Sequence, residues 1–96
     1  MMLLTIIAPP TMEEEIIDWL LIQPNISGFT SQAANGHGRG HVMSLVEQVT
    51  GRRHQITFWI ELEKKMADAI ITELKQAFSG SGLHYWLLPM AESGSI

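Results

Sequence analysis

The strongest strand signal in the chain is QITFWIEL, residues 55–62. Its β-branched and aromatic side chains are typical of a strand. Side chains alternate between the two faces of a strand, and here both faces carry large apolar residues. The segment therefore predicts a strand whose two faces both need cover. The two expected sets are Ile56, Phe58 and Ile60 on one face, and Thr57, Trp59 and Glu61 on the other.

Strands and helices alternate on either side of this segment. Thr11 lies three residues before Glu14, the spacing of a capping box, so a helix is expected to begin there and to end at Pro24. Apolar residues recur at helical spacing between residues 64 and 78, and the glycines of residues 79–82 end that helix. The further strands that the pattern predicts are residues 3–8, 29–34 and 83–90.

The order β-α-β, long connection, β-α-β predicts an α+β, ferredoxin-like β-α-β-β-α-β sandwich with a long loop between strands 2 and 3. Ninety-six residues are expected to form one domain, residues 1–96. In this fold both helices cover one sheet face, so the face with Trp59 and Trp86 is left bare. Burying each of these side chains would contribute roughly 2–3 kcal/mol. The pattern therefore predicts a homo-oligomer in which other copies cover that face.

Composition excludes several classes of protein. With 46% hydrophobic and 17% charged residues, the chain is typical of an ordered globular domain. A net charge of −4 and a pI of about 5.4 argue against nucleic acid as a partner. There are no cysteines, which fits a reducing compartment. The apolar N-terminal run is closed by Pro9-Pro10, too early for a signal peptide or a membrane span, so a cytoplasmic location is expected.

The connection between strands 2 and 3, residues 35–54, concentrates glycine, arginine and histidine between two apolar segments of an acidic chain. Long connections in compact domains are usually functional or disordered, so we expect the site here. The alternative is that the glycines serve loop mobility and that the charged side chains are only solvated. The candidate ligand- or partner-binding residues are Gly36, His37, Gly38, Arg39, His41, Arg52 and Arg53.

Three histidines of this connection also suggest a metal site. His37, His41 and His54 are the candidate ligands, and the glycines around them require the imidazoles to converge across subunits. A divalent metal ion is the cofactor that this alternative requires, and solvated histidines are the competing interpretation. Apolar residues between positions 42 and 49 have helical spacing, which is compatible with a short amphipathic helix or with an extended β-arm.

These elements together resemble the PII nitrogen-regulatory proteins. The local motifs that carry the resemblance are Gly36-His37-Gly38-Arg39 and the Leu88-Pro89 step in the last strand. More narrowly, residues 36–38 with residues 44–52 look like an uncharacterised bacterial PII-like family, often associated with heavy-metal efflux systems. The resemblance implies a homotrimer with ligand clefts between subunits and loops that signal to a partner, with a membrane efflux or transport protein as a candidate partner.

The chain also departs from that family. PII proteins that bind ATP carry a longer basic loop before the last strand, whereas residues 79–82 are Ser-Gly-Ser-Gly, so ATP binding is not expected. No cysteine nucleophile and no recognisable Ser-His-acid set is present, and an enzyme is not expected. The sequence therefore predicts a PII-like regulatory or sensor protein. The alternative is a metal-ion-binding protein resembling the CutA ion-tolerance family.

Overall fold

The computed structural model describes residues 1–38 and 53–96. Within these ranges the structure confirms the predicted order of strands and helices and the ferredoxin-like α+β class. The elements are β1 Met2–Ala8, the 3-10 helix η1 Pro10–Met12, α1 Glu13–Leu21, β2 Thr30–Gly36, β3 Arg53–Leu62, α3 Lys64–Ala77 and β4 His84–Pro89.

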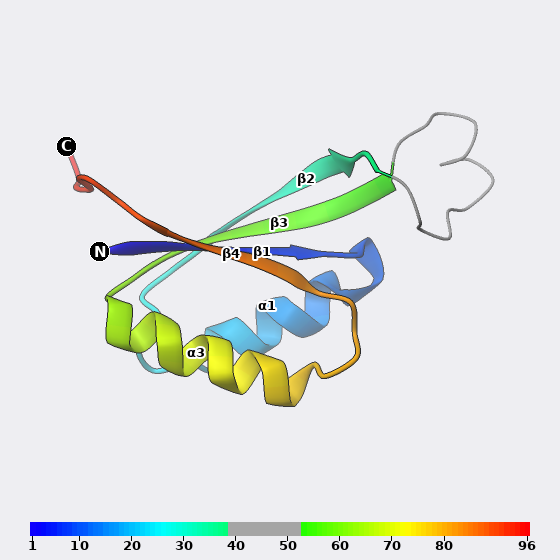
Figure 1. Ribbon diagram of the computed structural model, residues 1–96, viewed down its shortest axis with the longest axis horizontal. Coiled ribbons are helices and arrows are strands. Elements are labelled where there is room, and N and C mark those ends of the chain that lie inside the picture. Colours follow the sequence, from blue (N-terminus) through cyan, green and yellow to red (C-terminus); the bar gives the residue numbers. More distant parts are fainter. Residues whose placement is uncertain (39–52) are drawn as a thin grey trace.

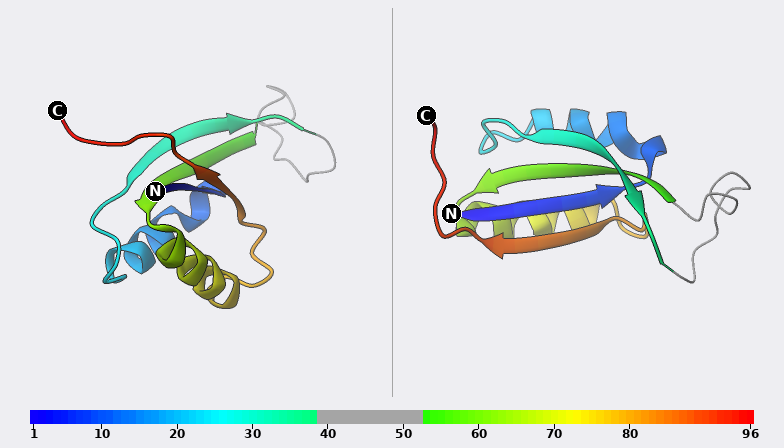
Figure 2. Two further views of the ribbon diagram at one scale, coloured as in Figure 1. Left: turned by 60° about the vertical axis from the view of Figure 1, so that its left-hand side comes forward. Right: turned by 90° about the horizontal axis from the view of Figure 1, so that it is seen from above.

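The four strands form one antiparallel sheet in the order β2-β3-β1-β4. The view from above in Figure 2 shows this order across the sheet. Both helices lie on the same side of the sheet, below it in Figure 1. Because β1 is central, Thr5 pairs with Trp59 of β3 on one side and with Trp86 of β4 on the other.

The core fills the space between the sheet and the two helices. Leu4, Ile6, Phe58 and Ile60 point to this side and are fully buried. The helices add apolar side chains at helical spacing, which cover the sheet as an amphipathic helix should. Each fully buried side chain of this kind contributes about 1.5–3 kcal/mol. The helix residues of the core are Ile16, Leu20, Ala67, Ile70, Ile71 and Leu74.

The opposite face of the sheet, here called the open face, carries no helix in the part of the chain that the structure describes (Figure 1). The predicted alternation is confirmed, because the other set of β3 and β4 side chains lies on it. Trp86 is 48% exposed and Leu88 is 51% exposed, whereas Trp59 is less exposed than either. The face is defined by Leu3, Thr5, Ile7, Arg53, Gln55, Thr57, Trp59, Glu61, His84, Trp86, Leu88 and the β2 residues paired with them.

The predicted capping box at the start of the first helix is wrong. The N-cap residue of α1 is Met12, and it makes no side-chain capping hydrogen bond. Pro10 begins a 3-10 turn in which the Met12 N–H donates to the Pro9 carbonyl at 3.0 Å. This turn moves the helix start to Glu13. The three glutamates of the first turn remain where they favour the helix dipole.

The predicted loop of residues 35–54 is also too long at both ends. Strand β2 continues to Gly36 and strand β3 begins at Arg53, so Gly36 pairs with Arg53 and Asn35 with His54. The hairpin ladder satisfies backbone groups that a loop would leave to water, which favours the longer strands. The predicted helix or β-arm between positions 42 and 49 lies outside the described residues.

The two termini lie at the same end of the sheet (Figure 1). The Met90 N–H donates to the Met1 carbonyl at 3.0 Å, which continues the β1–β4 ladder by one bond. Neither of the described helices has the length and apolarity needed to cross a lipid bilayer.

Candidate functional site

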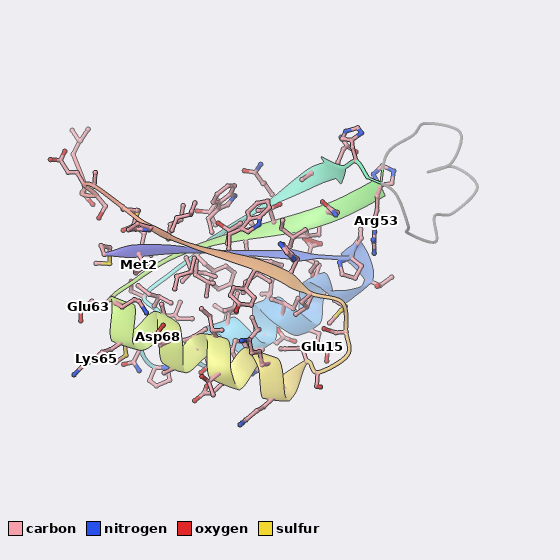
Figure 3. All side chains as sticks on the ribbon, in the orientation of Figure 1. Met2, Glu15, Arg53, Glu63, Lys65 and Asp68 are labelled. Carbon is pink, nitrogen blue, oxygen red and sulfur yellow. The ribbon has the colours of Figure 1, made fainter. Side chains whose placement is uncertain are left out.

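A pocket of about 490 Å³ lies at the end of the sheet where β1 and β2 finish and where β3 and β4 begin. We call it the sheet-end pocket. Ends of all four strands meet at this end of the sheet, and no described helix covers the open face there. Figure 3 labels Arg53 at this end and Met2 at the other. The described lining residues are Ile7, Ala8, Pro9, Asn35, Gly36, His37, Gly38, Arg53, Gln55, Gly82, His84 and Trp86.

One side of the sheet-end pocket is aromatic. His84 and Trp86 are two residues apart in β4, so both point to the open face. Their rings meet edge to face, with 5.7 Å between centroids and 82° between planes. Ile7 pairs with His84 across the ladder and, with Pro9, adds apolar surface beside the rings. This half of the pocket can take a flat apolar group.

The other side is polar and depends on a glycine. A Cβ built on Gly36 would lie 2.6 Å from Cδ of Gln55, so the Gln55 amide occupies space that only glycine leaves open. Arg53 pairs with Gly36 and places a guanidinium at the same rim. Arg53 and Gln55 are two residues apart in β3, so both side chains lie on the open face of the sheet. The pocket therefore has amide and guanidinium donors opposite its aromatic side.

The sheet-end pocket differs in charge from the rest of the chain. Among its described lining residues there is one arginine and no aspartate or glutamate, although the chain carries a net charge of −4. Arg53 has interactions of its own in the structure. Its guanidinium has five N–H donors, so it can serve an existing acceptor and a ligand together.

The structure brings together some of the predicted site residues. Gly36, His37, Gly38 and Arg53 all line the sheet-end pocket. His54 is not among the lining residues, because alternation along β3 places it on the side of Ile56 and Phe58. The other predicted ligand or partner residues, Arg39, His41 and Arg52, lie outside the described residues.

The metal hypothesis is tested only in part. His41, one of its three ligands, lies outside the described residues. Within residues 1–38 and 53–96, no three side chains of the types His, Cys, Asp or Glu come close enough to hold a metal ion.

Sequence reasoning missed Gln55, His84 and Trp86 as pocket residues. The available signal was register: once β1 pairs with both β3 and β4, these side chains and Ile7 must share the open face near its loop end. The structure places the His84 ring edge to face against Trp86.

A second pocket of about 360 Å³ lies on the other side of β4, against the end of α3. It includes the loop of residues 79–82, in which Gly80 and Gly82 have φ of +74° and +81°. The sequence offered no cation within this loop, but the structure places Lys75 beside it. The Lys75 ammonium lies 5.4 Å from the centroid of the Tyr85 ring, a cation–π distance.

The middle of the open face holds two polar atoms that are buried without a hydrogen-bond partner. They are Oγ1 of Thr5 and Nε1 of Trp59. The two residues face each other in the β1–β3 ladder, with Trp86 on the other side of Thr5. An unpaired buried polar group costs about 1–3 kcal/mol, so this row is a weak point of the isolated subunit.

Comparisons with known proteins agree with this architecture. The family described as "Protein of unknown function (DUF3240)" matches residues 1–96. The crystal structure of a DUF3240 family protein from Shewanella baltica is similar with a TM-score of 0.80 and 24% identity, over 99% of this chain and 94% of that one. A candidate PII-like signaling protein from Thermus thermophilus is similar with a TM-score of 0.64 and 17% identity, over 90% of this chain and 82% of that one. A comparison with curated proteins finds no match.

Proposed function

The chain belongs to the DUF3240 family and has a PII-like fold, and on this premise we propose that it is a regulatory protein that works by binding and not by catalysis. The observation that carries the proposal is the place of the sheet-end pocket. It lies at the strand ends that the connection between Gly36 and Arg53 joins. A ligand there touches both ends of the hairpin, so occupancy can be passed to the residues between them.

The proposed assembly is a homotrimer that covers the open face. The resemblance to PII proteins implies a trimer, and the chemistry of the face supports an apolar contact. Trp86 and Leu88 are about half exposed there, beside the unpartnered Thr5 hydroxyl and Trp59 indole N–H. A neighbouring copy would remove the apolar surface of Trp86 and Leu88 from water. The membrane efflux or transport protein suggested as a partner stays a prediction.

Sedimentation velocity and calorimetry together test the proposal. We expect one species with the mass of a trimer at micromolar concentration, and a monomer there would contradict the assembly. Calorimetry against Zn²⁺, Cu²⁺, Ni²⁺ and cyclic dinucleotides then searches for a ligand. Binding that is lost on Gly36→Ala, with the trimer retained, would support the sheet-end pocket. Binding of a metal ion alone, unaffected by Gly36→Ala, would favour the CutA-like alternative.

ATP is a separate prediction. We expect no ATP affinity tighter than about 100 µM, roughly −5.5 kcal/mol. The loop of residues 79–82 has no cation of its own, and the nearby Lys75 ammonium is held over Tyr85. One ammonium is too little to balance a triphosphate. Calorimetry with ATP and Mg²⁺ checks this, and saturable binding well below that concentration that is lost in Lys75→Gln would show that the second pocket is a phosphate site.

A further inference from the structure

We propose that the outer face of α1 is a docking surface for a basic amphipathic helix of another protein. Apolar side chains of that helix would cover Leu21 and Ile22, and its lysines or arginines would pair with the carboxylates beside them. The inference goes beyond the proposed function, because it names a contact with a partner. Both helices lie on the side of the sheet away from the open face (Figure 1), so an assembly that covers the open face leaves this surface in water.

The end of α1 exposes two large apolar side chains. Leu21, its last residue, is 68% exposed, and Ile22, its C-cap, is 75% exposed. Half-buried Ile17 lies one turn before Leu21, and half-buried Trp19 lies three residues before Ile22, so apolar surface extends to both sides of the pair. A surface helix ordinarily turns polar residues to water. The apolar end of α1 therefore indicates a contact surface.

The rest of the outer face of α1 is acidic. Glu14, Glu15 and Asp18 are the other exposed side chains of the helix, and with the apolar pair they lie within about a third of its circumference. The helix contains no lysine or arginine. Within the described ranges, none of these three carboxylates has a hydrogen bond or an ion pair. The helix dipole explains the glutamates of the first turn but not Asp18, which follows that turn.

Two features of α1 are unfavourable until a cation is added. Glu14 and Asp18 are four residues apart, and like charges at this spacing destabilise a helix. The last turn has no basic residue, although a cation there would interact favourably with the helix dipole. A lysine or arginine of a partner beside Asp18 would improve both, while apolar side chains of the same partner cover Leu21 and Ile22.

The outer face of α3 shows an ordinary solvated surface in the same protein. Lys64 and Asp68 are four residues apart and form an ion pair, with 2.7 Å between Nζ and Oδ1. None of the large apolar side chains of α3 is exposed. Its exposed residues mix both signs of charge with small or uncharged side chains: Lys64, Lys65, Asp68, Ala69, Thr72, Glu73, Lys75, Gln76 and Ala77. Helix α1 thus differs from its neighbour both in apolar exposure and in charge balance.

The charge of the face selects its occupant. A second copy that presented the same face in a two-fold contact would bring carboxylates against carboxylates. An anionic lipid surface would be repelled for the same reason. An amphipathic helix with lysine or arginine beside its apolar side matches both the sign of the charge and the apolar end, and helices bind other proteins through such a side.

Fluorescence anisotropy with three labelled, amidated peptides of equal length tests this match on the whole protein. The first peptide is an amphipathic helix of lysine and leucine, the second has the same composition in scrambled order, and the third has glutamate in place of lysine. We expect the amphipathic lysine peptide to bind at least about ten-fold more tightly than either of the others, because only it offers an apolar side and cations together. Added salt should weaken it, since the carboxylates are exposed.

Matched variants locate the contact. The double variant Leu21→Gln with Ile22→Gln should weaken the lysine peptide at least about ten-fold, because amides replace the apolar contact. Asp18→Asn removes one exposed charge and should weaken it about two- to five-fold. Glu73→Gln removes the same charge from the exposed face of α3 and should leave affinity unchanged. A far-ultraviolet circular dichroism spectrum like that of the wild type confirms that each variant is folded.

Results of several kinds would overturn the proposal. If the lysine peptide shows no saturation below about 1 mM, or binds no better than its scrambled form, a basic amphipathic helix is the wrong partner. Unchanged affinity in the double variant places the peptide elsewhere. Cosedimentation with phosphatidylcholine vesicles that the double variant loses makes the occupant a membrane, and dissociation of the native assembly by that variant makes it a second copy.

The proposed regulatory function fails by different results. It is contradicted if the wild-type protein is a monomer, or if ligands bind without any effect of Gly36→Ala. Neither result involves the outer face of α1, so the two proposals are tested separately.

Discussion

Both faces of the sheet carry large apolar side chains, but their surroundings are opposite. The covered face holds Leu4, Ile6, Phe58 and Ile60, all fully buried by the two helices. The open face holds large apolar side chains too, but Trp86 and Leu88 stay about half exposed. The open face also buries polar atoms that find no partner. The covered face therefore explains why the subunit folds, and the open face explains what it is still able to bind.

The largest expected effect is on the covered face. Phe58 is fully buried between β3 and the helices, so Phe58→Ala should lower the free energy of unfolding by about 3–5 kcal/mol through lost burial and a cavity. Urea unfolding at a fixed protein concentration measures it. Glu61→Ala, an exposed position on the opposite face of the same strand, is the control and should stay within about 0.5 kcal/mol. Equal losses in both variants would mean that the two faces are equally buried.

The next effect is expected on assembly. Leu88→Asp places a charge on the open face and should weaken association by about 2–4 kcal/mol, the size of an interface hot spot. Leu21→Asp is the matched control, because Leu21 is 68% exposed at the end of α1 on the other side of the molecule. Sedimentation velocity should show subunits for Leu88→Asp and the native assembly for Leu21→Asp. Dissociation by the Leu21 variant alone would place the interface on the helices.

A smaller effect is expected from the buried Thr5 hydroxyl in the middle of the open face. Thr5→Val replaces the unpartnered hydroxyl with a methyl group of similar size, and in an isolated subunit it should raise the free energy of unfolding by about 1 kcal/mol. Thr57→Val is the control, because Thr57 is also buried on this face but is not among the unpartnered atoms. Thermal unfolding at a low protein concentration checks both. A loss of stability for Thr5→Val there would show that its hydroxyl has a partner within the subunit.

Sequence reasoning predicted the covered face well because that face depends on local periodicity. Alternation in residues 55–62 and helical spacing in residues 64–78 each fix a buried side, and one arrangement buries both. The helix start was predicted less well, since Pro10 favours a 3-10 turn that competes with the capping box. Hairpin length was also underestimated, because Asn35 and Gly36 have low strand propensity and become strand only by pairing with His54 and Arg53 across the ladder.

The candidate site was predicted only in part, for a different physical reason. Composition drew attention to Gly36, His37, Gly38 and Arg53, and these do line the sheet-end pocket. His84 and Trp86 come from a strand almost fifty residues later, and they reach the pocket only through the β1–β4 register. Local patterns do not contain that register. The aromatic half of the pocket therefore needed the structure.

The smallest expected effect on stability is at Gly36, whose lack of a side chain leaves room for the Gln55 amide. Gly36 does not have positive φ, so Gly36→Ala meets no backbone penalty, and the Cβ collides only with the movable end of Gln55. We expect its free energy of unfolding to stay within about 0.5 kcal/mol of the wild type. Gly82→Ala is the matched control at the same pocket, and φ of +81° there should cost about 1–2 kcal/mol although no atom lies near its Cβ.

The two glycines thereby separate folding from binding. Gly36→Ala should displace the Gln55 amide and weaken whatever occupies the sheet-end pocket, with the melting temperature nearly unchanged. Gly82→Ala should lower the melting temperature more than it changes binding. If Gly36→Ala were instead the less stable of the two variants and the better binder, Gln55 would stabilise the fold at this rim and would not contribute to ligand binding. Differential scanning calorimetry and ligand titration on the same samples decide between the two, because the predicted changes lie in different measurements.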